Sequence, residues 1–427
     1  MSKRVSHALF IVCVTFCVWG ISLRNGFVWD DRILIQKNEA NLSQLSLLTV
    51  FSSDFWSTET EAGSSNYYRP LVTLSYMLDY ALYGLKPAGY HVTNILIHTL
   101  GVVSLWYLLV LLEVPLGAAT FAALFWAVHP ALAESVAWIS GRTDSLATVF
   151  VLLSCISAIK ALGGKKKDPR LIYLSAGLFG AGLLSKESAF VTPLLIALLL
   201  TFLNKRHRID RAVLTSFAVV AGIWLLLRWF VLAKPVGTET GDGAPLEIGL
   251  LSLLHVWGNL VWPPVFRIEY GASLTSQALL GGAILGGLFI MWILFTLGAK
   301  HGTRTTRYLY LAGLLAFIPS VMAVLLKSMI GARLIYTTAA FVVSGFALGM
   351  RIDQRPVVWR RSLACIVIGL AGFSVYRAQL WRSDIRLFSA ALQDADASSR
   401  NHLNLGIALY DNGDLTGALE HLSQDME

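Results

Sequence analysis

Residues 165–208 have the sequence KKKDPRLIYLSAGLFGAGLLSKESAFVTPLLIALLLTFLNKRHR. Two apolar runs, 171–184 and 189–203, flank the polar turn SKES at 185–188, and a basic cluster stands at each outer end. Short clusters of Lys and Arg beside apolar runs are typical of membrane-spanning helices, because such clusters stay on the cytoplasmic side. This stretch therefore predicts a membrane hairpin with cytosolic ends and a polar turn on the opposite side.

The composition of the whole chain is that of a membrane protein. Of its 427 residues 56% are hydrophobic and 14% are charged, whereas soluble domains carry about 45–50% apolar and about 25% charged residues. The net charge of +8 could indicate nucleic-acid binding. The basic residues, however, stand in short clusters between apolar runs, so we expect a lipid bilayer as the partner and no nucleic acid.

Eleven apolar runs approach the length of about 20 residues that a membrane span needs. These runs are 8–23, 90–112, 116–135, 144–162, 171–184, 189–203, 212–232, 278–298, 308–326, 334–350 and 362–376. The run 8–23 follows Lys3 and Arg4, as a signal peptide would, but no small-x-small cleavage pattern follows it, and we interpret it as a retained first span.

The basic residues assign the loops to two sides of the membrane. Loops on one side carry Lys165, Lys166, Lys167 and Arg170, then Lys205, Arg206, Arg208 and Arg211, then Lys300, Arg304 and Arg307, then Arg351, Arg355, Arg360 and Arg361. The positive-inside rule makes this side cytosolic. We predict an all-α polytopic membrane protein with about 11 transmembrane helices, a cytosolic N-terminus and a periplasmic or lumenal C-terminus. Its membrane is a bacterial inner membrane or the endoplasmic reticulum.

Two long segments of the predicted membrane domain, 1–380, lie on the outer side. The first outer loop, 24–89, is rich in Trp and Tyr, and its part from Pro70 to Tyr83 has the apolar spacing of a helix in the membrane interface. The second, 233–277, contains an apolar run from Leu250 to Val265 that ends in two prolines. We interpret this run as an interfacial or re-entrant element, because a full span would place Lys300 and Arg307 outside.

The last segment, 383–427, is polar enough to lie outside the membrane. Its NLG at 404–406, Leu409-Tyr410, Gly413-Asp414 and Ala418-Leu419 resemble a tetratricopeptide repeat, a pair of helices in 34 residues. The sequence stops before one such repeat is complete, so we expect a short helical fragment that either packs on the membrane domain or is a vestige of a repeat. The four cysteines all lie in apolar runs, and we expect neither a disulfide framework nor a metal site.

The strongest candidate for chemistry is the acidic pair Asp30 and Asp31, directly after the first span. Neighbouring side chains on an extended segment point in opposite directions, so one carboxylate can face a substrate while the other bonds to the protein. A buried carboxylate at the membrane surface suits a general base. The alternative is that the pair caps the following helix or faces solvent.

Four further polar clusters fall on the same predicted side. They are Tyr67-Tyr68-Arg69, the group of His129, Glu134, Arg142 and Asp144, the pair Lys186-Glu187, and Arg333 before Tyr336. Arg69 between aromatic residues can bind a lipid phosphate, or it can belong to an aromatic belt. The other clusters can be helix caps or hydrogen-bonded turns. Their convergence on one side favours a reaction centre, since a channel or carrier places its charges near the midplane.

Taken in order, several motifs resemble the transmembrane and tetratricopeptide-repeat-containing proteins. The motifs are FVWDD at 27–31, DFW at 54–56, YRPL at 68–71, Gly89-Tyr90-His91 with Asn94 and His98, His129-Pro130 with Glu134, Gly141-Arg142 with Asp144, Lys186-Glu187, and Arg333 with Tyr336. The resemblance covers nearly the whole chain. It departs from the family pattern at Ala332, where a Glu is common, and in lacking a long repeat array.

This resemblance implies a C-type-fold glycosyltransferase that uses a lipid-phosphate sugar. The donor would be a polyprenyl or dolichyl phosphate sugar, with mannose the sugar in animal members, and the acceptor a protein hydroxyl. Asp30 and Asp31 match the acidic pair where the base is expected. The positions expected to bind donor phosphate or substrate are Arg69, His91, His129, Glu134, Arg142, Asp144, Lys186, Glu187 and Arg333. No cofactor is expected beyond the donor, and a need for a divalent metal stays open.

The expected reaction is an inverting displacement at the anomeric carbon. Asp30 or Asp31 takes the acceptor proton, and Arg69, with Lys186, Arg142 or Arg333, stabilises the leaving lipid phosphate. The alternative is a non-catalytic membrane scaffold or a transporter of lipid-linked sugar. The two halves show no internal repeat for a transporter, and the repeat fragment is small for a scaffold, so both features favour the enzyme.

Overall fold

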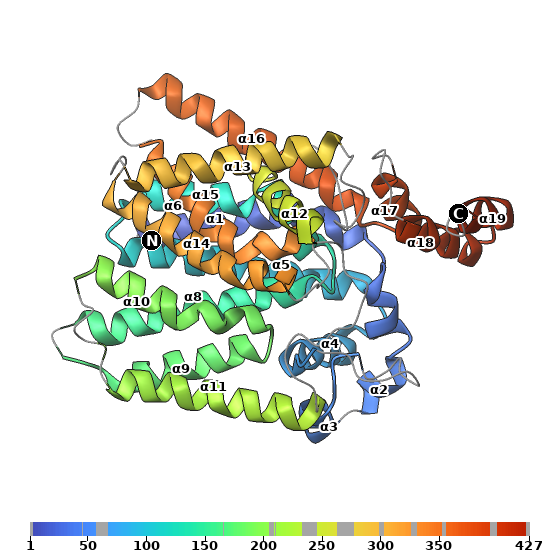
Figure 1. Ribbon diagram of the computed structural model, residues 1–427, viewed down its shortest axis with the longest axis horizontal. Coiled ribbons are helices and arrows are strands. Elements are labelled where there is room, and N and C mark those ends of the chain that lie inside the picture. The colour runs from blue at the N-terminus through green and yellow to red at the C-terminus, as the bar shows by residue number, and fades with distance from the viewer. Residues whose placement is uncertain are drawn as a thin grey trace.

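Long helices lie side by side along one direction in the computed structural model (Figure 1). The structure describes residues 3–44, 46–56, 67–164, 166–204, 209, 211–232, 246–262, 277–298, 303–325, 331–351, 356–392 and 399–423. Within these ranges the regular secondary structure is helical and includes no strand. The predicted all-α multispan class is therefore confirmed.

Eight of the described helices are long and apolar enough to cross a membrane. They are α1 (Lys3–Trp19) with η1 (Gly20–Arg24), α5 (Pro87–Leu111), α8 (Arg142–Gly163), α11 (Arg211–Leu232), α13 (Gln277–Gly298), α14 (Arg304–Leu325), η6 (Ala332–Ile335) with α15 (Tyr336–Gly349), and α16 (Val357–Leu380). The predicted span 116–135 forms α6 (Leu116–Ala127), followed after a bend of 52° by η3 (Pro130–Leu132) and α7 (Ala133–Ala137). Counting this bent pair as one span gives nine.

The remaining two predicted spans form shorter helices. Run 171–184 becomes α9 (Pro169–Leu183), and run 189–203 becomes η4 (Glu187–Val191) with α10 (Thr192–Phe202). Both lie beside α8, and α9 also packs against α11 (Figure 1). With 15 residues in α9 and 11 in α10, each falls short of the length of about 20 residues that a span needs. The predicted number of eleven is therefore not confirmed.

The apolar run that begins at Leu250 forms α12 (Leu246–Gly258), which packs along α13. Its 13 residues give a helix of roughly 20 Å, too short to cross a bilayer. The two helices approach so closely at Gly286 that a Cβ there would lie 1.8 Å from the carbonyl oxygen of Leu254. Small residues at such contacts are common between membrane helices.

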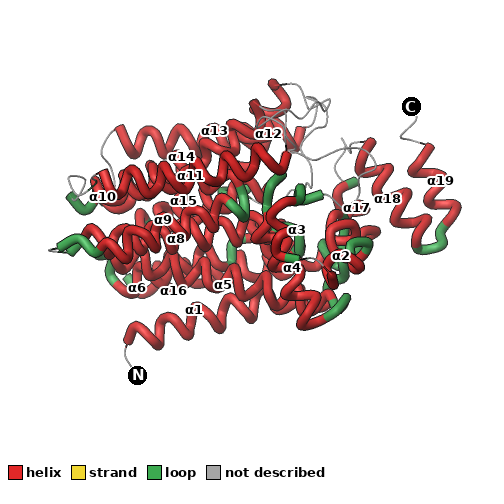
Figure 2. The backbone as a smooth tube through the Cα atoms, turned by 90° about the horizontal axis from the view of Figure 1, so that it is seen from below, coloured by secondary structure: helices red, strands yellow, loops and turns green. Residues whose placement is uncertain are grey.

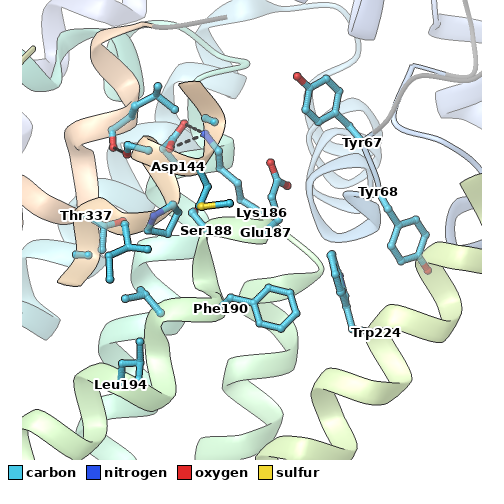
Figure 3. A pocket seen from close by; sticks show the side chains of 18 of the residues that line it. Tyr67, Tyr68, Asp144, Lys186, Glu187, Ser188, Phe190, Leu194, Trp224 and Thr337 are labelled. Atoms are coloured by element: carbon cyan, nitrogen blue, oxygen red, sulfur yellow. Dashed lines mark hydrogen bonds and ion pairs between the residues drawn. The ribbon is translucent and has the colours of Figure 1, made fainter. Parts of the chain in front are cut away.

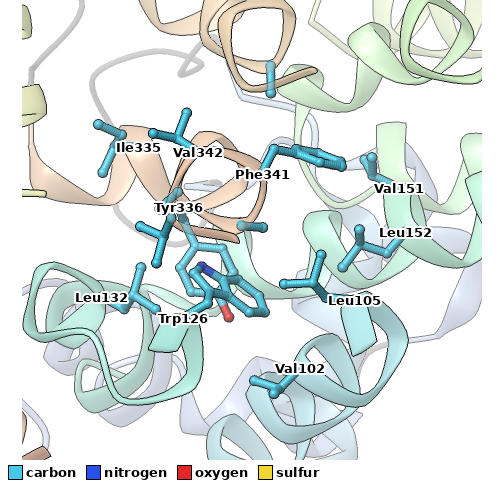
Figure 4. Close-up of a cluster of buried hydrophobic side chains, with 14 of the residues drawn as sticks. Val102, Leu105, Trp126, Leu132, Val151, Leu152, Ile335, Tyr336, Phe341 and Val342 are labelled. Atoms are coloured by element: carbon cyan, nitrogen blue, oxygen red, sulfur yellow. The ribbon is translucent and has the colours of Figure 1, made fainter. Parts of the chain in front are cut away.

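Large side chains fill the centre of the bundle between α5, α6, α8 and α15 (Figure 4). Trp126 and Tyr336 are fully buried there. The ring of His98 is hydrogen-bonded to the Tyr336 hydroxyl at 2.6 Å and to the Ala127 carbonyl oxygen at 3.0 Å. A polar group inside a membrane needs such internal partners, because no water reaches it.

The outer segments gather at one end of the bundle (Figure 2). The first outer loop forms η2 (Arg32–Gln36), α2 (Glu39–Gln44), α3 (Leu47–Ser52) and α4 (Pro70–Tyr83). α4 has the bounds expected for the interfacial helix. Its Leu78 and Leu82 are exposed, as are Leu47 and Leu48 of α3, which suits helices that lie on a membrane surface.

The C-terminal segment forms α17 (Asp384–Ala391), α18 (Ser399–Asp411) and α19 (Leu415–Ser423). These helices lie at the same end as the first outer loop, and the N-terminus lies at the opposite end (Figure 2). α18 and α19 pack against each other as a helix pair. Of the basic residues used to predict the topology, Lys165, Lys205, Arg206, Arg208, Lys300 and Arg355 lie outside the described residues.

Labelling of single cysteines tests this arrangement. In a background with the four native cysteines replaced by Ser, we expect Asn412→Cys to react with an impermeant maleimide from the non-cytosolic side and Lys167→Cys only after the cytosolic side is opened. Asn412 is exposed and Lys167 is half-buried. Reaction of both variants from the same side would contradict the predicted topology.

Candidate active site

Two cavities meet at the outer end of the bundle. The first, of about 420 Å³, is here named the apolar cavity, and the second, of about 430 Å³, the polar cavity. Both are lined by Tyr67, Lys186, Glu187, Ala323 and Leu334. The turn at Lys186 and Glu187 therefore stands where the two cavities adjoin.

The apolar cavity lies between η4–α10, α11 and α14. Phe190 and Trp224 pack edge to face on its wall, with ring centroids 5.2 Å apart (Figure 3). Leu194, Ile318 and Met322 also line it, and between 45% and 51% of each residue is exposed at the surface of the molecule. A cavity bounded by exposed apolar side chains on membrane helices can admit an apolar chain from the lipid.

The polar cavity holds most of the charged residues singled out in the sequence. Its lining includes four cationic residues, Arg69, Lys186, Arg333 and Arg400, and two acidic residues, Asp30 and Glu187. Even without Arg400, the cations Arg69, Lys186 and Arg333 outnumber the two acidic residues, and this excess of positive charge suits a phosphate. Phe55 and Trp56 of the DFW motif and Tyr67 supply aromatic wall.

The two carboxylates of the acidic pair have different surroundings. Asp30 lines the polar cavity. Asp31 is fully buried, and its Oδ1 accepts hydrogen bonds from the amide of Ser140 at 2.8 Å and from the Ser140 hydroxyl at 2.5 Å. Its Oδ2 accepts one from the amide of Val28 at 3.2 Å. Asp31 therefore ties the loop to the turn before α8, whereas Asp30 is placed to meet a substrate.

Burial raises the pKa of Asp31 from its ordinary value of 3.8 to about 7, although the hydrogen bonds from Ser140 and Val28 lower it in part. Low-dielectric surroundings disfavour the charged form of a carboxyl group. Asp31 is thus a group whose ionisation costs free energy in the folded protein, and it titrates near neutral pH.

Trp29 turns the chain just before the pair. Its φ is +53°, a left-handed value that is a rare outlier for a bulky residue. The indole stacks on Trp138 with centroids 4.9 Å apart, and Trp138 stacks on Trp381 at 5.4 Å. The amide of Trp29 donates to Oδ1 of Asp384 at 2.7 Å. Together, these contacts hold the turn that carries Asp30 in this conformation.

Each of three cations at the cavities is paired with a carboxylate. Lys186 donates to both oxygens of Asp144 at 2.7 Å (Figure 3). The other two pairs are Arg69 with Glu187, 3.0 Å apart, and Arg333 with Glu134. Arg69 also lies over the Tyr67 ring at 4.4 Å. The pairs hold the cations in fixed places at the cavity walls.

Glu134 does not line either cavity but fixes Arg333, which does. Its Oε2 accepts the amide of Arg333 at 3.0 Å, while Oε1 pairs with the guanidinium. The Arg333 guanidinium also lies 5.4 Å from the centroid of the Trp138 ring. Glu134 is therefore a positioning residue, reaching Arg333 across 199 positions of sequence.

Arg142 is the centre of a separate buried network. Its guanidinium is fully buried and donates to Asn94 Oδ1 at 2.8 Å, Ser75 Oγ at 3.0 Å and the Tyr90 carbonyl oxygen at 3.1 Å. It also pairs with Asp79 at 2.7 Å. The structure therefore places Arg142 outside both cavities, where it joins α4, α5 and α8.

His91 and His129 also lie outside the cavities. His91 is buried on α5 against the backbone of Asn25 and Gly26. His129 Nδ1 accepts a hydrogen bond from the amide of Ala131 at 3.3 Å. The proton is therefore on Nε2, which donates to the Leu260 carbonyl oxygen 3.2 Å away. Both histidines support the packing of outer segments.

The structure also gives a place at the site to residues that the sequence did not predict as site residues. Trp29, Trp138 and Ser140 shape the acidic turn, and Arg400, Leu403 and Asn404 of α18 line the polar cavity. The sequence shows Trp29 directly before the acidic pair. No local pattern, however, could place α18 at this cavity. No group of three His, Cys, Asp or Glu that could hold a metal is present among the described residues.

Comparison with known proteins gives clear relatives. The chain is 26% identical to Protein O-mannosyl-transferase F38B6.6 of Caenorhabditis elegans, over 96% of this chain and 61% of that protein. It is 34% identical to Protein O-mannosyl-transferase Tmtc1 of Drosophila melanogaster, over 65% of this chain and 36% of that protein. The chain is similar to protein O-mannosyl-transferases. The resemblance drawn from the motifs is thereby confirmed.

The similarity extends to Protein O-mannosyl-transferase TMTC4 of Homo sapiens, 25% identical over 98% of this chain and 65% of that protein. The chain thus spans between about a third and two thirds of the length of these relatives. No protein-family model matches it. Among solved structures, ArnT from Cupriavidus metallidurans bound to undecaprenyl phosphate superposes with a TM-score of 0.49 at 13% identity, over 98% of this chain and 75% of that chain.

The raised pKa of Asp31 predicts a pH-dependent contribution to stability. Because the folded protein holds this proton to a higher pH than the unfolded chain, ionisation costs folding free energy as the pH rises from about 4 to about 7. Asp31→Asn does not titrate there. We expect the apparent Tm of the unsubstituted protein minus that of Asp31→Asn to decrease from about pH 5 to about pH 8.

The control is Asn412→Ala, at an exposed position. It removes no ionisable group, so the corresponding Tm difference should not change with pH. A Tm difference for Asp31→Asn that stays constant or grows over the same interval would contradict the assignment of this titration to Asp31.

Proposed function

We propose that the chain is a membrane glycosyltransferase that transfers a sugar from a polyprenyl or dolichyl phosphate to a protein hydroxyl on the non-cytosolic side. The observation that carries the proposal is the junction of an apolar cavity and a cationic cavity at Lys186 and Glu187. The names of the relatives support mannose as the sugar and protein as the acceptor. The proposal includes the C-type glycosyltransferase fold that the sequence motifs imply.

The apolar cavity, the junction and the polar cavity each bind one part of the donor. The apolar chain enters between α10, α11 and α14, where Leu194 and Met322 are exposed at the surface of the molecule. The phosphate lies at the junction, within reach of Lys186 and of the guanidinium groups of Arg69 and Arg333. The sugar then occupies the polar cavity, which Asp30 also lines. This order follows the order of polarity within the donor itself.

The reaction is a displacement at the anomeric carbon. The carboxylate of Asp30 takes the proton of the acceptor hydroxyl, and the hydroxyl oxygen forms a bond to C1 of the sugar. The bond between C1 and the phosphate oxygen breaks, and its electron pair stays on the lipid phosphate. The fixed cations stabilise the negative charge that develops there. Configuration at C1 inverts because attack and departure occur on opposite faces.

Release of lipid phosphate distinguishes this function from its alternative. A transporter of lipid-linked sugar moves the donor without breaking the C1–oxygen bond. Purified protein in lipid vesicles, supplied with dolichyl-phosphate mannose and peptides that contain Thr, should release dolichyl phosphate and form a mannosylated peptide. Movement of intact donor without any release would contradict the proposed function.

The acidic turn gives a direct test of the base. We expect Asp30→Asn to reduce turnover by about 10²–10⁴-fold, the usual contribution of a general base. Its donor affinity and Tm should stay near those of the unsubstituted protein, because Asp30 lines the cavity, while Asp31 makes the hydrogen bonds to Ser140 and Val28 that join the loop to the turn before α8. Turnover is measured as dolichyl phosphate released. Near-normal turnover in Asp30→Asn would remove Asp30 as the base.

The lateral entrance is tested with two matched leucines. Leu194 lines the apolar cavity and is 51% exposed, while Leu174 on α9 is 49% exposed and does not line it. Leu194→Trp should displace part of the lipid chain. Each buried CH₂ group is worth about 0.8 kcal/mol, so losing two such contacts weakens donor binding roughly tenfold. We expect no change for Leu174→Trp, and equal donor affinity in both variants would contradict this entrance.

A further inference from the structure

The helix α18 supplies a wall of the polar cavity from outside the membrane domain. Its Arg400, Leu403 and Asn404 line the same cavity as Asp30. Residues at this spacing lie on one face of a helix. The remaining face points elsewhere, since Leu405 and Ala408 are buried and Ile407 is exposed. The cavity face of α18 is thus a defined surface of two polar side chains and one apolar side chain.

This wall is linked to the loop that carries Asp30. Arg32, two positions further on, bonds through Nε to Asp384 at 2.5 Å and through Nη1 to Asp411 at the end of α18 at 2.8 Å. Asp384 also accepts the amide of Trp29. One arginine therefore links α17 and α18 to the acidic turn, and the distance between the α18 wall and Asp30 is set by the fold.

The chemistry of the wall fits a polypeptide. A carboxamide such as that of Asn404 both donates and accepts hydrogen bonds, as a peptide backbone does. Arg400 can donate to backbone carbonyl oxygens, and Leu403 offers an apolar contact to a side chain. The phosphate in the proposed reaction has three other cations, Arg69, Lys186 and Arg333, at the cavity walls.

Resting on the proposed function, we propose that α18 holds the acceptor as an extended polypeptide segment, with Asn404 bonded to its backbone and Arg400 beside it. The segment lies along α18, and its hydroxyl side chain enters the polar cavity toward Asp30. Arg400 and Asn404 are specificity-determining residues for the acceptor and take no part in binding the donor.

The experiment separates the acceptor from the donor. The probes are dolichyl-phosphate mannose and a pool of unstructured peptides with a central Thr and random flanks, used with the full chain in vesicles. For Asn404→Ala and Arg400→Ala we expect the peptide KM to rise by about two- to tenfold, the effect of losing one hydrogen bond. The rate of donor hydrolysis by water and the kcat at saturating peptide should not change.

Two exposed residues of the same types serve as matched controls. Asn412→Ala follows α18, and Arg386→Ala lies on α17, and neither residue lines a cavity. We expect both to keep the original peptide KM. An unchanged peptide KM in Asn404→Ala and Arg400→Ala would overturn the proposal. An equal loss of donor hydrolysis and peptide transfer would overturn it too, because it would place these residues in donor binding or folding.

Crosslinking makes the result independent of turnover. A photoreactive amino acid at position 404 should capture the peptide pool, and one at position 412 should not. Failure of the unsubstituted protein to release dolichyl phosphate would contradict the proposed function, whereas failure of capture at position 404 in an active protein would contradict the acceptor site alone.

Discussion

The buried carboxylate of Asp31 joins the first outer loop to the turn that begins α8, and the geometry of the site depends on this junction. Both of its oxygens are used, two hydrogen bonds from Ser140 and one from Val28. A left-handed conformation such as that of Trp29 costs about 1–3 kcal/mol, so it persists only where neighbours enforce it. The Ser140 turn itself packs tightly, since a Cβ at Gly141 would lie 2.1 Å from the carbonyl oxygen of Glu134.

The charged residues around the cavities follow one rule. A buried charge is costly unless it has a partner, and each of Lys186, Arg69 and Arg333 has a carboxylate from another part of the chain. A ligand would displace some of these carboxylates from their cations more easily than others. Glu134 is buried behind Arg333, whereas the Glu187 side chain is 40% exposed and lines both cavities. In the proposed reaction, a phosphate can therefore replace Glu187 beside Arg69 more readily than it can replace Glu134 beside Arg333.

Features that depend on neighbouring residues could be predicted from the sequence, whereas those that depend on contacts between distant segments could not. Apolar runs predicted the helical class and the bounds of α4, because hydropathy and proline position are local. Local patterns also gathered Asp30, Arg69, Lys186, Glu187 and Arg333 on one side. They could not separate Arg142, which has its partners on α4 and α5, from residues that line a cavity. The apolar runs 171–184 and 189–203 are themselves shorter than a full span, but the basic cluster at the outer end of each run favoured two spans.

In the proposed reaction the pairing of cations also bears on release of the product. The donor is a phosphodiester with one negative charge, and the leaving lipid phosphate is a monoester, which carries about −1.5 to −2 at neutral pH. Unpaired cations would bind this product more tightly than the donor and hold it in the site. Because Asp144 and Glu187 stay next to Lys186 and Arg69, they can take these cations back as the phosphate departs. The same carboxylates that lower the cost of burying the cations therefore favour turnover, at the junction where the lipid chain leads back into the bilayer.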